Sequence, residues 1–234
     1  DLMAENWYVD PNAAGAGNGV DWANAYTTLQ AAETAKNQVT GGDPVLFHCK
    51  SSAGGADTSV SFNGWTTDVD GYISVQGGYA AAETGTPGTP EYNAEYSTSY
   101  YHIEAGNVAT GCIYIVEDFV RVDKVQIKNT VSTTSYAIYV LGQTAASNDI
   151  RVSNCILWGV CSGTGNGIGF YIGNDADPIV VVWNCIAYGW YISGDSGFNG
   201  FKAYACTSAD FYNCLAYGNY IGYILSAARA AGRA

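Results

Sequence analysis

A six-residue pattern recurs three times in the second half of the chain and constrains the fold more than any other feature. The copies begin at Asn154, Asn184 and Asn213, and each reads asparagine, cysteine, an aliphatic residue, leucine or alanine, an aromatic residue and glycine. The copies lie 30 and 29 positions apart. Because six matched columns at nearly equal spacing are improbable by chance, we predict that the chain is built from internal repeats.

Fainter copies precede these three. The segment 125–130 is aligned with 150–155, which places Asn129 in the asparagine column. Weaker copies occupy 73–78 and 101–106. Each unit opens as a strand with alternating apolar residues, meets a turn and continues with further short strands.

The repeat length distinguishes between solenoid architectures. Leucine-rich repeats need a leucine consensus, and ankyrin or tetratricopeptide repeats need helical periodicity; this chain has neither. A coil of three short strands and three turns fits a period of about 25 to 30 residues. We therefore predict an all-β fold, a single-stranded right-handed parallel β-helix of about six coils. Residues one period apart are expected to stack about 4.8 Å from each other.

Two columns of the repeat have a structural explanation in this fold. The asparagines are predicted at strand-to-turn corners, where stacked amides hydrogen-bond from coil to coil. The cysteines that follow them are predicted to be free thiols in the core, since parallel side chains make a disulfide torsion awkward. The asparagine column is Asn129, Asn154, Asn184 and Asn213, and the cysteine column is Cys155, Cys185 and Cys214.

The N-terminal part of the chain differs in kind from the repeats. A short strand is predicted at 7–9, and Asp21 is predicted to be the N-cap of an amphipathic helix that runs to about Val39. This helix would cover the open core at one end of the stack. The predicted division is a strand, loop and capping helix at 1–44, coils at 45–225 and a tail or cap at 226–234.

Two N-terminal segments carry a resemblance to a known class of proteins. The run WYVDPN at 7–12 and the run GVDWANAYTTLQAA at 19–32 resemble the openings of many pectin-lyase-like right-handed β-helix proteins. Such openings occur in exported bacterial surface proteins and in phage structural proteins. The resemblance implies the fold but not one function, because this fold hosts lyases, hydrolases, tailspikes, adhesins and inert scaffolds.

The sequence shows no converging set of acid and base residues. Enzymes of this fold bring two or three catalytic groups together from adjacent coils. The two predicted outward columns are Gln126, Arg151, Val181 and Asp210, and Lys128, Ser153, Trp183 and Tyr212. No catalytic residue is predicted from them. Acidic loops at 68–71 and 174–177 could hold Ca²⁺, but neither has EF-hand spacing, and no metal site or other cofactor is predicted.

Aromatic side chains are the candidates for binding. Three of them recur at one position in successive coils. Stacked aromatics that are exposed suit sugar rings or a protein interface, whereas the alternative is that they pack beneath a loop or fill a corner. The candidate glycan-binding or partner-binding residues are Trp158, Tyr188, Tyr217, Trp183, Tyr212, Trp190, Tyr191 and Tyr220.

The charge and hydropathy of the chain argue against two classes of partner, nucleic acids and membranes. A net charge of −12 disfavours nucleic acid, and the absence of a run of about 18 apolar residues argues against membrane insertion. We predict a non-catalytic structural or adhesive protein outside the cell, on a virion or a cell surface. It is expected to self-associate or to join a larger assembly, with polysaccharide as a further partner. The alternative is a polysaccharide lyase or glycoside hydrolase of the same fold.

Overall fold

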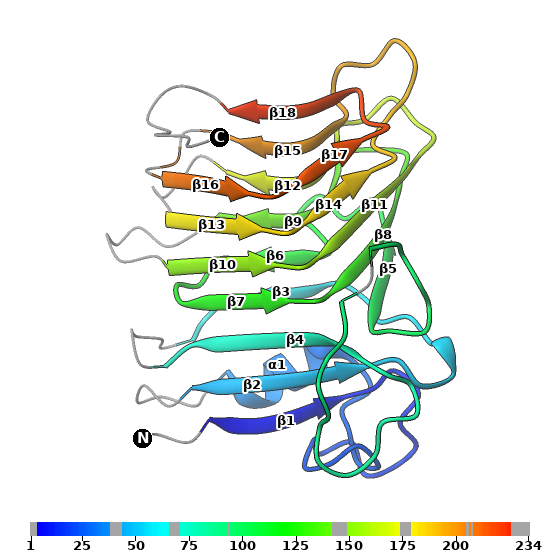
Figure 1. Cartoon of the computed structure of the whole chain (residues 1–234), viewed down its shortest axis with the longest axis vertical. Helices are drawn as coiled ribbons and strands as arrows, with labels where there is room; N and C mark the ends of the chain where they lie inside the picture. Colours follow the sequence, from blue (N-terminus) through cyan, green and yellow to red (C-terminus); the bar gives the residue numbers. More distant parts are fainter. Residues whose placement is uncertain are drawn as a thin grey trace.

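The computed structural model describes residues 4–37, 44–65, 71–92, 94–141, 149–173, 179–204, 206 and 208–225. Over these residues the protein is a parallel β-solenoid, in which three stacks of strands run from the N-terminal to the C-terminal end (Figure 1). All the paired strands run parallel to each other. The prediction of an all-β chain of stacked parallel strands is confirmed.

From residue 73 onward the chain contributes strands to the three sheets in turn. Sheet A contains β1 (Glu5–Val9), β2 (Val45–Lys50), β4 (Ile73–Tyr79), β7 (Val120–Asp123), β10 (Asp149–Ser153), β13 (Ile179–Trp183) and β16 (Ser208–Tyr212). Sheet B contains β5 (His102–Gly106), β8 (Gln126–Val131), β11 (Ile156–Cys161), β14 (Ile186–Tyr188) and β17 (Leu215–Tyr217). Sheet C contains β3 (Val60–Phe62), β6 (Ile113–Ile115), β9 (Ser135–Val140), β12 (Gly167–Ile172), β15 (Asn199–Ala203) and β18 (Ile221–Leu225).

A single residue in the left-handed region turns the chain from sheet A to sheet B. At Asn154, Asn184 and Asn213 the φ angle is +53°, +53° and +48°. Asparagine tolerates this conformation because its short polar side chain can hydrogen-bond locally. Asn213 Nδ2 donates to Asn184 Oδ1 at 2.7 Å, and Asn184 Nδ2 donates to Asn154 Oδ1 at 3.2 Å. The predicted asparagine ladder is confirmed for these three residues.

The predicted register of the preceding repeat is wrong. In sheet A, Arg151 pairs with Arg121, so Lys124, with a φ of +57°, occupies the position of the ladder asparagines. The segment 125–130 belongs to sheet B, where its Asn129 is fully buried. The Asn129 amide exchanges hydrogen bonds with the Ser135 hydroxyl at 2.9 and 3.1 Å. Asn129 is therefore a core residue and not a member of the ladder.

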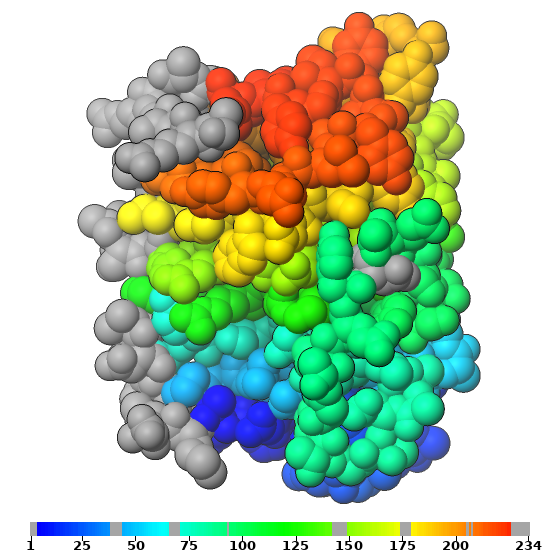
Figure 2. All heavy atoms as spheres, in the orientation of Figure 1, coloured from blue at the N-terminus to red at the C-terminus, as the bar shows by residue number. Residues whose placement is uncertain are grey.

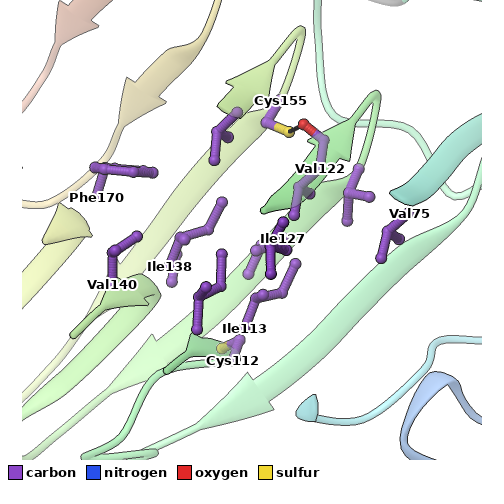
Figure 3. Packing of buried hydrophobic residues seen from close by; sticks show 14 of the residues in the cluster. Val75, Cys112, Ile113, Val122, Ile127, Ile138, Val140, Cys155 and Phe170 are labelled. Atoms are coloured by element: carbon purple, nitrogen blue, oxygen red, sulfur yellow. Dashed lines mark hydrogen bonds between the residues drawn. The ribbon is translucent and has the colours of Figure 1, made fainter. Parts of the chain in front are cut away.

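The interior is filled by alternate side chains from all three sheets. Val122 on sheet A, Ile127 on sheet B and Ile138 on sheet C are buried and point into a common core (Figure 3). Cys155 and Cys185 lie in this core, and all seven cysteines of the chain are free. The prediction of buried free thiols is confirmed at these two positions, because free cysteine packs as a small apolar side chain.

Helix α1 (Leu29–Lys36) lies beside the first strands at the N-terminal end and is shorter than predicted (Figure 1). Thr28 is its N-cap, and the Thr28 hydroxyl accepts a hydrogen bond from the first turn. Asp21 forms a separate turn, in which its carboxylate accepts from the backbone N–H of Asn24 at 2.8 Å. The predicted N-cap at Asp21 is wrong because this turn precedes the helix. The predicted end at Val39 lies outside the described residues.

Acidification is expected to destabilise the fold through His48. The His48 ring is buried; its Nδ1 lies 2.7 Å from the Tyr79 hydroxyl and its Nε2 lies 2.8 Å from Asn6 Oδ1. Burial lowers the pKa of His48 from 6.5 to about 4. Between these values the unfolded chain binds a proton that the folded chain does not. Stability should therefore fall by up to about 3 kcal/mol as the pH drops from about 6.5 to about 4.

Urea unfolding at pH 7 and pH 4.5 tests this expectation. The wild type should lose more stability on acidification than His48→Gln, which has no group that titrates at this position. Other acidic groups are the same in both proteins and cancel in the comparison. An equal loss in the two proteins would contradict the assignment.

Candidate binding surfaces

The repeat aromatics form a continuous stack on sheet B. Trp158 pairs with Tyr188 and Tyr188 pairs with Tyr217 in the strand register. Their ring centroids are 5.9 and 5.1 Å apart, with angles of 11° and 0° between the ring planes. The rings therefore cover one another's faces along the solenoid axis and direct their edges outward. A sugar that stacks needs an exposed face, so this column does not form a flat platform along its length.

The N-terminal end of this stack is covered by a segment of the chain. The Tyr96 ring meets the Trp158 ring edge-on at 5.2 Å. The next residue of this column toward the N-terminal end is Lys128, which forms an ion pair with Glu104 at 3.2 Å. Residues 80–92 and 94–101, coloured teal to green in Figure 2, pack across this part of the surface. Trp158 thus packs beneath a loop, which was the alternative prediction for the aromatic residues.

Trp190 is not a surface residue. Its side chain is fully buried, and its indole Nε1 donates to the Leu157 carbonyl oxygen at 3.0 Å. The next residue, Tyr191, is 52% exposed and stacks on Tyr220 with a centroid distance of 6.3 Å. Burial therefore removes Trp190 from the predicted binding residues, whereas Tyr191 and Tyr220 remain accessible.

A shallow open groove on the outer face of sheet A brings together two other predicted residues. Trp183 and Tyr212 are paired in the register of β13 and β16, and both line this groove. Among the described residues, those that line the groove are Asp149, Arg151, Ile179, Val181, Trp183, Asn184 and Tyr212. A second recess shares Arg151 and Trp183 with it and extends toward Arg121 and Asp123. The outward columns therefore continue from Arg121 and Asp123, and the predicted members Gln126 and Lys128 belong to sheet B.

The charged groups of the groove are paired with each other. Arg151 Nε and Nη2 donate to the two carboxylate oxygens of Asp149 at 2.8 and 2.6 Å. The Tyr72 hydroxyl also donates to Asp149 at 2.6 Å, and the Arg121 guanidinium lies 3.6 Å from the Tyr72 ring centroid. Burial acts to raise the pKa of Asp149, but these hydrogen bonds outweigh it and hold the pKa below its usual value. Asp149 is therefore an ionised acceptor and is poorly suited to act as a general acid.

The other carboxylates that the structure describes on this face do not converge on Asp149. Asp123 accepts hydrogen bonds from Gln76, Ser153 and Asn154 at 2.9, 2.6 and 2.6 Å. Because Asp123 pairs with Ser153, it lies about 13 Å along the strand direction from Asp149. Asp210 pairs with Val181 two strands from β10. Glycosidases hold their two carboxyl groups about 5 to 10 Å apart, and the backbone positions of these aspartates are more widely spaced.

A tyrosine cluster on the outer face of sheet C was missed by the sequence reasoning. Tyr136 stacks on Tyr171 at 5.0 Å, and Tyr139 lies 5.2 Å from Tyr114 and 5.0 Å from Tyr171. Lys202 lies 5.6 Å from the Tyr171 ring centroid. Tyr114, Tyr139 and Tyr171 share one column, but they are 25 and 32 positions apart in the sequence. Because the spacing is unequal, a fixed repeat period does not align these three tyrosines.

The described residues contain no group of three or more histidine, cysteine, aspartate or glutamate side chains that could hold a metal ion. The acidic residues 68, 70, 175 and 177 of the predicted calcium loops lie outside this part of the chain. No described helix has both the length and the apolar character needed to span a membrane.

Comparison of the chain with protein-family models, with curated proteins and with solved structures gave no match.

Proposed function

We propose that the chain is a non-catalytic structural or adhesive protein that binds neutral glycans through the groove on sheet A. In this proposal the solenoid is a right-handed parallel β-helix of about six coils, in line with the strong preference for right-handed crossovers between parallel strands. The observation that carries it is the groove itself: Trp183 and Tyr212 line it, while Arg151 and Asp149 neutralise each other at one side.

The chemistry of the groove suits a sugar without charge. Aromatic side chains offer apolar surface to the C–H groups of a sugar ring, and the Arg151–Asp149 pair still has N–H donors and carboxylate lone pairs for hydroxyl groups. A polyanion would meet Asp149, Asp123 and Asp210 on the same sheet of a protein with net charge −12. Electrostatic repulsion therefore disfavours polyuronates relative to neutral polysaccharides.

The proposed setting outside the cell is supported by the N-terminal segments of the chain. The segments 7–12 and 19–32 resemble the openings of exported bacterial surface proteins and phage structural proteins. This resemblance supports a place on a virion or a cell surface, where a rigid solenoid spaces its contacts along one axis. Self-association or docking onto a larger assembly is part of the same proposal.

Loss of Trp183 is expected to weaken glycan binding without unfolding the protein. Retention on a panel of immobilised neutral glucans, mannans and galactans would be measured for the wild type, Trp183→Ala and Tyr191→Ala. We expect at least about a tenfold weaker affinity for Trp183→Ala, since a buried aromatic contact contributes 1 to 2 kcal/mol or more at a binding site. Tyr191→Ala lies outside the groove and should bind as the wild type does. Equal binding by both variants, or no binding to any glycan, would overturn the assignment of the groove.

Turnover assays on the same panel test the enzymatic alternative. Neither reducing ends nor unsaturated products that absorb in the ultraviolet are expected, because the described carboxylates on this face are separated or paired. Product release that is lost in Asp149→Asn would establish a lyase or glycosidase and would refute the non-catalytic proposal.

A further inference from the structure

The tyrosine cluster on sheet C brings four phenol rings into contact across three adjacent strands. Tyr114 comes from β6, Tyr136 and Tyr139 come from β9, and Tyr171 comes from β12. The ring centroids of Tyr136 and Tyr139 both lie 5.0 Å from that of Tyr171, and they lie 5.2 Å from each other. All four side chains are half-buried, so each keeps part of its surface accessible to solvent.

The positions of these tyrosines do not depend on either end of the solenoid. The strands β6, β9 and β12 are each paired on both sides within sheet C (Figure 1). Their register places Tyr139 between Tyr114 and Tyr171. The two residues between Tyr136 and Tyr139 are buried, which leaves both tyrosines on the outer face. Strand pairing therefore holds the four rings together.

Glycine residues allow the Tyr139 ring to lie close against the backbone. A Cβ atom added at Gly173 would lie 2.6 Å from this ring, and one added at Gly111 would lie 3.0 Å from the Tyr139 Cβ. A larger residue at either position would displace the Tyr139 side chain from its contacts with Tyr114 and Tyr171. The close packing of the rings is therefore built into the fold.

Phenol rings in contact react with each other when both lose an electron. One-electron oxidation removes an electron and the hydroxyl proton from a tyrosine, and the unpaired electron is shared with the ring carbons beside the oxygen. Two neighbouring radicals join through these carbons, and the two displaced ring hydrogens move to the oxygens and restore both hydroxyls. The pair loses two hydrogen atoms in total, which reduce hydrogen peroxide to two molecules of water.

We propose that the tyrosine cluster on sheet C is a site of oxidative cross-linking, in which a carbon–carbon bond joins Tyr171 on β12 to Tyr136 or Tyr139 on β9. The oxidant is hydrogen peroxide used by a haem peroxidase. Tyr171 is the shared partner because it contacts both tyrosines of β9, and the Tyr136 ring stacks on it with 23° between the planes. All seven cysteines are free, so this bond would supply a covalent link between coils that disulfides do not. The proposal extends the structural role of the chain and does not depend on glycan binding by the groove.

Treatment of the whole chain with a haem peroxidase and hydrogen peroxide, at low protein concentration, tests the proposal. The monomeric product should show the fluorescence of dityrosine and should be lighter by two hydrogen atoms. Trypsin cuts after lysine and arginine, so it places the tyrosines of β9 in peptide 129–151 and Tyr171 in peptide 152–202. Mass spectrometry should find these two peptides joined, with the bond at Tyr171.

The cross-link should also stabilise the protein against heat. The joined residues are 32 or 35 positions apart in the sequence, and a bond between them closes a loop in the unfolded chain. We expect the Tm of the purified cross-linked monomer to rise by about 5 to 10 °C, if a carbon–carbon bond restricts the unfolded chain as a disulfide does.

Matched variants identify the site. Tyr171→Phe keeps the ring but removes the hydroxyl, so it should lose both the joined peptides and the rise in Tm. Tyr217→Phe makes the same change in the tyrosine stack on sheet B and should keep both. Circular dichroism checks that each variant is folded. Joined peptides that persist in folded Tyr171→Phe, or dityrosine that is found only in covalent dimers, would overturn the proposal. A wild type that forms no dityrosine under conditions that couple free tyrosine would also overturn it.

Discussion

Replacement of Trp190 by alanine is expected to lower the free energy of unfolding by about 3 to 5 kcal/mol. The Trp190 ring is fully buried between sheets B and C, and it occupies the space left by glycines. A Cβ atom added at Gly159 would lie 2.6 Å from this ring, and one added at Gly169 would lie 3.1 Å from it. Alanine would leave a large cavity and would also leave the Leu157 carbonyl oxygen without its indole donor. Both effects destabilise the folded state.

Tyr191→Ala is the matched control for this prediction. The two residues are adjacent in sequence, but Tyr191 is 52% exposed and its main contact is the stack with Tyr220. We expect a loss of at most about 1 kcal/mol, the size of an aromatic pair interaction. Urea unfolding followed by circular dichroism would measure both variants. Similar losses for the two substitutions would show that Trp190 does not fill the core as described.

The second large effect is expected at Asn184, in the middle of the asparagine ladder. Asn184→Val should cost about 3 to 4 kcal/mol for two reasons. A β-branched residue is strained at a φ of +53°, and the substitution removes hydrogen bonds to both Asn154 and Asn213. The free energy of unfolding from urea titration is again the measurement.

Asn184→Gly separates the two causes. Glycine accepts a positive φ without strain, so this variant should lose only the ladder bonds, at about 1 kcal/mol each. The valine variant should therefore be clearly less stable than the glycine variant. If the two variants were equally stable, the left-handed corner would not be a constraint at this position.

The strongest repeats allowed correct predictions of the stacked parallel strands and of the asparagine corners between them. The asparagine must satisfy a left-handed φ and an amide ladder at once, so few other residues can replace Asn154, Asn184 or Asn213. In the preceding coil Lys124 takes the same backbone conformation without the amide. Both 120–125 and 125–130 alternate apolar residues, and the alignment favoured the segment that contains Asn129. Hydrophobic alternation alone could not distinguish these two registers, because both strands bury alternate residues.

The candidate sites were less predictable than the fold. Sequence spacing placed Trp183 over Tyr212 and Trp158 over Tyr188 correctly, since strand pairing follows the repeat. It could not show that Tyr96 covers Trp158 or that Trp190 turns into the core. Those outcomes depend on loops and on glycine positions, which have no fixed period. The groove on sheet A likewise depends on the ion pair between Arg151 and Asp149, which are close in sequence. Asp149 also accepts a hydrogen bond from Tyr72, and Tyr72 is too distant in sequence for spacing to predict this contact.

The central claim is that residues about 29 or 30 positions apart are direct neighbours in adjacent coils, and contacts between side-chain amides test it most directly. In a nuclear Overhauser spectrum of the selectively protonated protein, the side-chain amide protons of Asn184 should give cross-peaks to those of both Asn154 and Asn213. Asn129 should give cross-peaks to Ser135 and none to Asn154. Cross-peaks that link Asn129 to Asn154, or the absence of contact between Asn184 and Asn213 in the folded protein, would contradict the register on which the solenoid and the groove depend.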